Sequence, residues 1–349
     1  MYGFARNILF RFSGETAHEL ALDSLNAANR LGLLSPFVAK PVDAPVEVMG
    51  IKFPNAVGMA AGLDKNADYL DALGTLGFGF VEVGTVTPKP QPGNAKPRLF
   101  RIPEKEAIIN RMGFNNKGVH HLVEQVKQRH FQGIVGINIG KNLTTSVEDA
   151  EKDYLYCLKE VYAHADYITV NISSPNTPGL RSLQFGESLE ALLRALKEEQ
   201  SRLAEQYQRY VPIAVKIAPD MTDDEIRLVA NNILNQKMDG VIATNTTLDR
   251  DAVLGLDNAD EAGGLSGRPV RDKSTHVIRV LAETLEGELP IIGVGGIDCA
   301  EAACEKIEAG ASLVQVYTGF IYQGPKLVKE AAEAVAALQA SKKLQTSKK

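Results

Sequence analysis

Short apolar runs alternate along this chain with longer stretches in which apolar residues recur every three or four positions. The apolar runs predict eight strands, at residues 55–59, 80–84, 134–139, 167–172, 213–217, 240–244, 291–294 and 313–317. The stretches between them, such as 188–209 and 224–235, have the spacing of helices. Strands that are apolar on both faces and alternate with helices indicate a buried parallel sheet. Eight such units favour a closed (β/α)₈ barrel, the TIM barrel, over an open sheet.

Two helix-start signals agree with this division. Thr222-Asp-Asp-Glu225 is a capping box directly after the fifth strand. Asp298-Cys-Ala-Glu301 resembles a second one after the seventh strand, with Asp in place of Ser or Thr.

Three connections are too long for simple turns: 85–115, 173–187 and 245–268. Each follows a strand, so all three are expected at the carboxyl-terminal rim of the barrel, where such enzymes hold their active sites. Long loops in a compact domain usually bind ligands or act as lids.

Residues 1–45 do not continue the barrel pattern. Phe4, Ile8 and Leu9 share one face of a short expected helix, and a second helix is expected from Glu15 to Leu31. Two interpretations stay open: a cap that plugs the bottom of the barrel, or a helical pair that rests on a membrane surface. The barrel then occupies 46–338, and 339–349 is expected to be a basic, disordered tail.

Composition excludes several classes of protein. The 349 residues carry a net charge of −5 and include 44% apolar residues, so a large core is possible and a nucleic-acid surface is not expected. Cys157, Cys299 and Cys304 form no CxxC pair, which argues for a reducing compartment.

We expect no membrane span, no secretory signal and no metal site, because the apolar windows are too short and no HExxH spacing occurs. A nicotinamide group is not expected, since no GxGxxG motif opens the first helix.

Glycine-rich turns end the seventh and eighth strands, at 293–296 and 317–319. Barrels often bind a phosphate there through backbone N–H groups, although such glycines also serve simply as tight turns. Lys216 lies inside an apolar strand, where an unpaired ammonium is costly to bury. We expect its amine to meet an anion or a ligand carbonyl; contact with solvent or an internal Asp is the alternative.

Amides and hydroxyls gather after the strand ends. The asparagines expected near the rim are Asn110, Asn115, Asn138, Asn171, Asn176 and Asn245. Because an amide both donates and accepts, such a set suits a neutral heterocycle such as a pyrimidine, with one anionic group near Lys65. The protic groups after the fourth strand are Ser173, Ser174 and Thr177; a serine needs a relay or an acidic substrate C–H to act as a base.

Four motifs resemble those of the dihydroorotate dehydrogenases. They are Ala-Gly-Leu-Asp-Lys at 61–65, Asn-Arg-Met-Gly-Phe at 110–114, Asn-Ile-Ser-Ser-Pro-Asn-Thr-Pro-Gly-Leu at 171–180 and Ile-Gly-Val-Gly-Gly-Ile at 292–297. Serine at Ser174 resembles class 2, the quinone-dependent branch, as does the N-terminal helical extension, and the bacterial members are the most similar. The match runs through almost the whole chain.

The resemblance implies one FMN per subunit and a route for two electrons. FMN contacts are implied for Ala61, Gly62, Leu63, Asp64, Lys65, Thr85, Asn138, Asn171, Lys216, Thr244, Gly267, Gly296, Tyr317 and Thr318. Contacts with dihydroorotate or orotate are implied for Lys65, Asn110, Arg111, Met112, Gly113, Phe114, Asn171, Asn176, Asn245 and Thr246. Ser174 is implied as the base at C5, with Thr177 as its relay, while hydride passes from C6 to flavin N5. Lys216 is implied to stabilise charge on the reduced flavin.

The resemblance also implies oxidation of (S)-dihydroorotate to orotate in pyrimidine (UMP) biosynthesis, with a membrane quinone as acceptor. His18 and Arg101 match positions that line the quinone path. A peripheral protein on the cytoplasmic face of the bacterial membrane is expected. Two alternatives stay open: a soluble flavin barrel that uses fumarate or NAD, and a catalytically silent barrel that binds a phosphate ligand.

Overall fold

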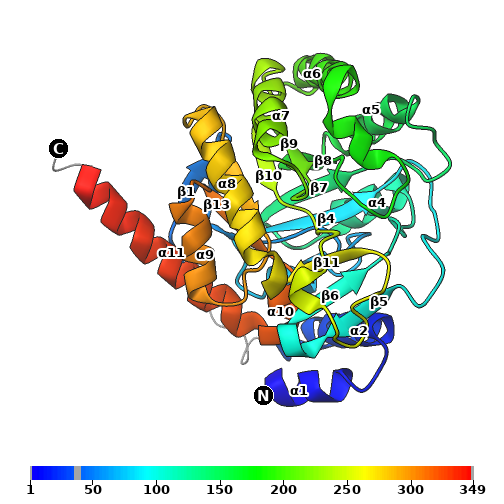
Figure 1. The fold of residues 1–349 in the computed structure, drawn as a ribbon, viewed down its shortest axis with the longest axis vertical. Helices are drawn as coiled ribbons and strands as arrows, with labels where there is room; N and C mark the ends of the chain where they lie inside the picture. The colour runs from blue at the N-terminus through cyan, green and yellow to red at the C-terminus, as the bar shows by residue number, and fades with distance from the viewer. Residues whose placement is uncertain (1, 35–40, 347–349) are drawn as a thin grey trace.

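A closed barrel of eight parallel strands forms the centre of the computed structural model, which describes residues 2–34 and 41–346 (Figure 1). In order around the barrel these are β3 (Val57–Met59), β4 (Phe80–Val86), β7 (Ile134–Ile139), β8 (Tyr167–Asn171), β9 (Ile213–Ile217), β10 (Gly240–Ala243), β12 (Ile291–Val294) and β13 (Leu313–Val316), which returns to β3. The predicted barrel is confirmed, and every predicted strand overlaps an observed one.

Burial on both faces explains the apolar character of these strands. Every residue of β4 and β9 is buried, because one face lines the barrel interior and the other packs against the outer helices. The outer helices are α3 (Leu70–Gly74), α4 (Val119–Gln128), α5 (Ala150–Val161), α6 (Gly186–Tyr207), α7 (Asp223–Asn235), α8 (Arg271–Leu285), α9 (Ala300–Glu308), α10 (Thr318–Gln323) and α11 (Pro325–Thr346).

Of the two predicted helix-start signals, the structure contains one. Thr222 and Glu225 form the reciprocal capping box at the start of α7, as predicted. The second prediction was wrong: α9 begins after Cys299 and has no side-chain cap. Asp298 instead forms an ion pair with Arg268, in which Asp298 Oδ2 lies 2.5 Å from Arg268 Nε.

A hairpin of β1 (Val46–Val48) and β2 (Ile51–Phe53) closes the amino-terminal end of the barrel. Phe53 packs edge-on against Phe80, the first residue of β4, with ring centroids 5.1 Å apart. Met49 in the hairpin turn lies close to Gly240, the first residue of β10. The carboxyl-terminal rim is therefore the end where ligands can enter.

A second small sheet stands on that rim. It contains β5 (Leu99–Ile102), β6 (Ala107–Asn110) and β11 (Gly264–Gly267), with antiparallel pairing in the order β11–β6–β5. Two of the long connections thus contain strands, and those strands join the connection after β4 to the connection after β10. Short 3₁₀ turns, η1 (Pro103–Lys105), η2 (Leu180–Gln184), η3 (Asp251–Val253) and η4 (Arg268–Val270), shape the remaining rim segments.

The N-terminal helices α1 (Tyr2–Leu9) and α2 (Gly14–Arg30) also lie at the carboxyl-terminal rim (Figure 1). α2 contacts α3 and β5, and α1 contacts α10. The Tyr2 hydroxyl donates to the Ile321 carbonyl at 2.7 Å. The interpretation of this pair as a plug for the barrel bottom is therefore wrong, because the β1–β2 hairpin occupies that end.

The C-terminal helix corrects a second expectation. α11 continues to Thr346, so most of the segment expected to be disordered is helical. Residues 347–349 lie outside the described residues.

Candidate active site

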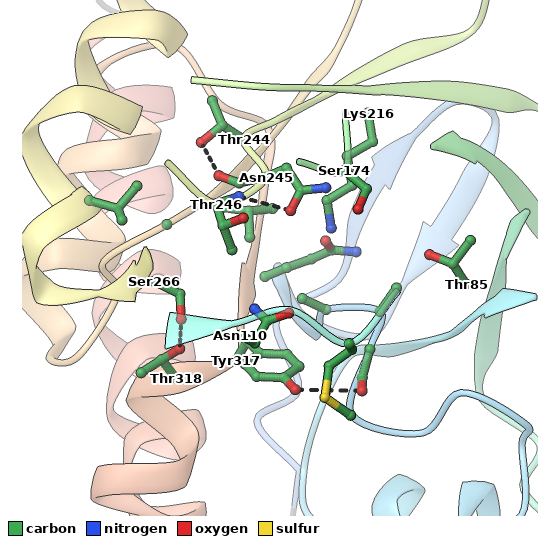
Figure 2. A pocket seen from close by; sticks show the side chains of 18 of the residues that line it. Thr85, Asn110, Ser174, Lys216, Thr244, Asn245, Thr246, Ser266, Tyr317 and Thr318 are labelled. Carbon is green, nitrogen blue, oxygen red and sulfur yellow. Dashed lines mark hydrogen bonds between the residues drawn. The ribbon is translucent and has the colours of Figure 1, made fainter. Parts of the chain in front are cut away.

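A cavity of about 1040 Å³ opens at the carboxyl-terminal rim of the barrel. Its wall comes from the ends of the barrel strands together with β6, β11 and the connection after β8. Figure 2 shows the side chains of Asn110, Ser174, Lys216, Asn245 and Tyr317 around this one space. The cavity therefore joins residues that are far apart in the sequence.

Most of the residues singled out from the sequence line this cavity. They are Ala61, Gly62, Lys65, Thr85, Asn110, Met112, Gly113, Phe114, Asn171, Ser174, Asn176, Lys216, Thr244, Asn245, Thr246, Gly267, Gly296, Tyr317 and Thr318. The prediction that loop and strand-end residues converge at one mouth thus agrees with the geometry.

Glycine turns form one side of the wall. Gly295 and Gly296 have φ values of +125° and +71°, which residues with a Cβ rarely adopt. A Cβ on Gly296 would also lie 2.4 Å from Arg271 Cα. The turn itself requires these glycines, and their backbone approaches the cavity without side chains in the way.

Lys216 on β9 brings an amine to the cavity from inside the barrel. Its side chain is buried, and among residues 2–34 and 41–346 no carboxylate lies within ion-pair distance of it. Desolvation lowers the pKa of Lys216, and the negative charge of Glu82 opposes that shift. A cation in this position is suited to an anionic or carbonyl group of a ligand.

Lys65, in the segment after β3, supplies a second amine to the cavity. Desolvation and the nearby Arg98 charge lower the pKa of Lys65 to about 8, while Glu15 and Asp64 act in the other direction. Lys65 is thus mostly protonated at neutral pH and can bind a carboxylate.

The amides of the wall are held by hydrogen bonds. Asn176 Nδ2 donates to the Asn110 carbonyl at 3.1 Å, which links the connection after β8 to β6. Asn171 Nδ2 donates to Thr85 Oγ1 at 3.0 Å, and Asn245 Nδ2 donates to Ser173 Oγ at 3.0 Å. Thr246 Oγ1 is buried and has no partner in the described part of the chain, so it has bonding capacity left for a ligand.

Ser174 is the buried hydroxyl that faces this space from the connection after β8. Its Oγ accepts the Asn176 backbone N–H at 3.2 Å, which fixes the direction of the side chain. Thr177 is buried behind the wall and does not line the cavity. Within the described chain no hydrogen bond joins the Thr177 and Ser174 hydroxyls, so a direct relay between them is not formed in this structure.

Several predicted contacts lie elsewhere. Asp64 caps the turn after β3, where its carboxylate accepts backbone N–H groups of residues 66, 68 and 69. Burial raises the pKa of Asp64 to about 6. Arg111 turns outward and pairs with Glu261 at 2.6 Å. Asn115 and Asn138 also stand outside the wall.

Two buried polar residues were missed by the sequence analysis. Glu82 on β4 and Gln315 on β13 lie inside the barrel, and Gln315 Nε2 donates to Glu82 Oε2 at 2.6 Å. Gln315 also lines the cavity, and its Oε1 is buried without a partner among the described residues. A charged residue inside an otherwise apolar strand, as at Phe80-Val-Glu82, is the signal that could have found them.

A second cavity, of about 640 Å³, lies between the N-terminal helices and the rim. It is mostly apolar, and its wall includes Leu9, Phe10, Ala17, His18, Leu63, Arg101, Ile108 and Phe320. Arg101 lies over the Phe10 ring, at 4.4 Å from the centroid, and its Nη1 is buried without a partner in the described chain. Burial and the Lys65 charge lower the pKa of His18 to about 3, so this imidazole is neutral at physiological pH.

Adjacent residues separate the two cavities. Gly62 lines the larger cavity and Leu63 lines the smaller one. Leu63, expected among the cofactor contacts, therefore belongs to the wall of the second cavity.

Comparison with known proteins shows a consistent resemblance. Residues 44–338 match the family model described as Dihydroorotate dehydrogenase. The chain is 67% identical over 336 residues to Dihydroorotate dehydrogenase (quinone) of Cellvibrio japonicus (strain Ueda107), covering 96% of this chain and 98% of that one. It is 66% identical over 338 residues to Dihydroorotate dehydrogenase (quinone) of Teredinibacter turnerae (strain ATCC 39867 / T7901), covering 97% and 100%.

Solved structures give the same result. A ligand-free DHODH from Eimeria tenella superposes with a TM-score of 0.83 and 39% identity over 92% of this chain and 95% of that chain. DHODH from the same organism in complex with ferulenol gives a TM-score of 0.84 and 36% identity, covering 93% and 92%.

Proposed function

Because the chain belongs to the dihydroorotate dehydrogenase family, we propose that its larger cavity holds FMN and dihydroorotate together and that its smaller cavity admits a quinone. The reaction is the flavin-dependent oxidation of (S)-dihydroorotate to orotate, with the quinone as electron acceptor. The observation that carries this proposal is the pair of cavities on either side of Gly62 and Leu63.

The residues of the larger cavity fit FMN. The glycine turns at Gly267 and Gly295–Gly296 leave backbone close to the space, which suits a phosphate. Lys216 brings a buried amine to the cavity, and Gln315 Oε1 is an acceptor without a partner among the described residues. When bound, FMN supplies the acceptor for the hydride that leaves C6 of dihydroorotate.

The amides and Lys65 suit the substrate. Dihydroorotate carries one carboxylate and a ring with alternating N–H and C=O groups. Lys65 can bind the carboxylate, and Asn110, Asn171, Asn176 and Asn245 can pair with the ring. Ser174, the protic group of the connection after β8 that lines the cavity, takes up the C5 proton on Oγ while its own hydroxyl proton passes to water.

The smaller cavity suits a quinone. Its wall is apolar, as a ring with a hydrocarbon tail requires, and Arg101 Nη1 provides one unpaired donor for a quinone carbonyl. Leu63 adjoins the FMN cavity, so electrons have a short way to travel.

The outer surface of the N-terminal pair suits a membrane surface. Phe4, Leu31 and Leu33 are 75%, 72% and 56% exposed, whereas Ala17 and Leu22 on the inner side of α2 are buried. None of the described helices is long and apolar enough to span a bilayer. We therefore propose a peripheral position, with α1 and α2 against the cytoplasmic face of the membrane and the quinone entering between them.

An anaerobic spectrum tests the reaction. The purified protein should be yellow, and dihydroorotate should bleach the flavin band until a quinone is added. A protein that cannot take up FMN, or whose flavin is not bleached, contradicts the proposal.

The quinone path is tested separately. Arg101→Met should raise the KM for quinone about tenfold, while the rate of flavin reduction by dihydroorotate stays the same. Arg11→Met is the matched control, because Arg11 is exposed and does not line the smaller cavity. Equal effects of the two variants contradict this path.

A further inference from the structure

We propose that Glu82 is a positioning residue that fixes the orientation of the amides in the substrate cavity, and so decides which ring donors and acceptors the cavity takes. The inference rests on the proposed function, in which Asn171 and Asn245 contact the substrate. Glu82 itself lies fully buried inside the barrel and does not line the cavity. It therefore acts through its neighbours.

Three donors converge on the Glu82 carboxylate. Asn138 Nδ2 donates to Oε1 at 2.8 Å, while the Tyr167 hydroxyl and Gln315 Nε2 donate to Oε2 at 2.8 and 2.6 Å. The positive charge of Lys216 acts on the same group. Each of these three neighbours turns a donor toward Glu82, whose two oxygens act as acceptors in all three bonds.

This requirement passes along one series of hydrogen bonds, here called the branch, that leads from Glu82 through Asn138 toward the carboxyl-terminal rim. Since Asn138 presents its NH₂ to Glu82, its carbonyl faces the other way and accepts from Thr85 Oγ1 at 2.6 Å. The Thr85 hydroxyl has one hydrogen, which is used in that bond, so it can only accept from its next neighbour. That neighbour is Asn171, whose Nδ2 lies 3.0 Å away.

The same constraint on donor and acceptor directions extends to the residues of the cavity wall. With its NH₂ on Thr85, Asn171 turns Oδ1 toward the rim, where it accepts from Ser173 Oγ at 3.0 Å. The Ser173 oxygen then accepts from Asn245 Nδ2 at 3.0 Å, and Asn245 Oδ1 accepts the Thr246 N–H at 2.8 Å. The groups left for a ligand are thus set: a second N–H on Asn171 and a second carbonyl lone pair on Asn245.

All donors in this branch point toward Glu82, and the branch is continuous from the barrel interior to the substrate amides. If the link at Asn138 were lost, Thr85 could turn its hydrogen to Asn171, and that amide could rotate. A ring with its donors and acceptors exchanged would then be accepted more readily. If Glu82 only stabilised the fold, the loss of this link would leave the preference between the two kinds of ring unchanged.

Two substitutions separate these roles. Asn138 and Tyr167 are both buried, both donate to Glu82, and neither lines the cavity. Only Asn138 belongs to the branch that reaches Asn171 and Asn245, whereas Tyr167 contacts Gln315, so Tyr167→Phe is the matched control for Asn138→Leu. The probes are orotate and its counterpart in which the C4 carbonyl is replaced by an amino group. Their affinities for the oxidised FMN holoenzyme are read from the shift of the flavin band.

Wild type should prefer orotate, and Asn138→Leu should reduce that preference about tenfold or more, because the wild-type cavity leaves a polar group of the wrong ring unmatched and the variant does not. Tyr167→Phe should keep the preference within about threefold. If Asn138→Leu does not fold, Asn138→Ser replaces it, since a serine hydroxyl can donate or accept and fixes no direction.

An unchanged preference in the Asn138 variant, or an equal loss in Tyr167→Phe, overturns the role of Glu82 and leaves the proposed function intact. If wild type neither binds orotate nor is bleached by dihydroorotate, the proposed function fails first and the role of Glu82 fails with it.

Discussion

Glu15 Oε1 accepts a hydrogen bond from Arg98 Nη2 at 2.7 Å, and this largely buried ion pair joins α2 to the connection beside the substrate cavity. Arg98 Nη1 also donates to the carbonyls of Pro92 and Asn94 at 2.6 and 2.8 Å. Asn94 Nδ2 in turn donates to the Arg111 carbonyl at 2.8 Å. One set of contacts thus connects α2 with the 110–114 segment.

Glu15→Gln should weaken the attachment of α1 and α2 to the rim. Removing one charge from this pair should reduce the free energy that holds these helices on the rim by about 1–3 kcal/mol. We expect quinone-dependent turnover to fall several-fold, while flavin reduction by dihydroorotate changes little. Glu19→Gln is the control, because Glu19 is exposed and its ion pair, with Lys96 at 3.7 Å, is long and exposed as well. A loss of both half-reactions would mean that the pair supports the whole rim.

The same pair predicts a pH dependence. Burial alone would raise the pKa of Glu15, but the hydrogen bond and charge of Arg98, together with Lys96, bring it below its usual value. A carboxyl with a lowered pKa stabilises the folded form above its unfolded pKa of roughly 4.3 and loses that contribution as the pH falls further. Limited proteolysis of α1–α2 should therefore accelerate below about pH 4. In Glu15→Gln this acid step should be absent.

Ser174→Ala should slow flavin reduction by dihydroorotate by roughly 10²–10⁴-fold, because general base work contributes about that factor. Stopped-flow absorbance at the flavin band measures it. Orotate affinity should change little, since the alanine leaves the cavity walls in place. Ser182→Ala is the matched control: this serine is exposed on η2 and bonds only to the Gly179 carbonyl. Comparable slowing in both variants would point to the loop as a whole.

Lys216→Met should stabilise the FMN-free form of the protein and weaken its affinity for FMN. The FMN-free form should unfold at a higher temperature, because an unpaired buried amine is removed. FMN affinity should fall tenfold or more, since a hydrogen bond to a charged group contributes about 1.5–3 kcal/mol. Thermal unfolding with and without added FMN measures both effects. Lys326→Met, at an exposed position of α11, should change neither.

Orotate affinity should weaken as the pH rises through about 8. Lys65, whose pKa is lowered to about 8, is charged below that pH and neutral above it, and only the charged amine attracts a carboxylate. Titration of the flavin band with orotate between pH 6 and about pH 10 would show this slope. Lys65→Met should bind weakly and without the slope. A slope that persists in the variant would assign it to another group.

The barrel could be predicted because its strands are buried on both faces and its helices are amphipathic. The rim sheet could not: β5 and β6 are short apolar runs, and Pro97 and Pro103 beside them favour loops. The pairing of β6 with β11 joins segments that are far apart in the sequence, so no local pattern indicates it.

The site was predictable where polar residues follow a strand end, as with Asn171 and Ser174. Glu82 and Gln315 were missed because they lie within strands, and the sequence alone does not fix which strand residues point into the barrel. Thr177 and Asn138 were expected at the site but do not line the cavity, because loop packing and strand register, which the sequence does not show, decide which polar residues reach it.

The partition between the two cavities is a single step of backbone, from Gly62 to Leu63. In the proposed function, this wall keeps a water-soluble acid and a lipid-soluble ring in separate cavities, and only electrons pass between them. The protein would thereby join an aqueous metabolite pool to a lipid-dissolved one without mixing them.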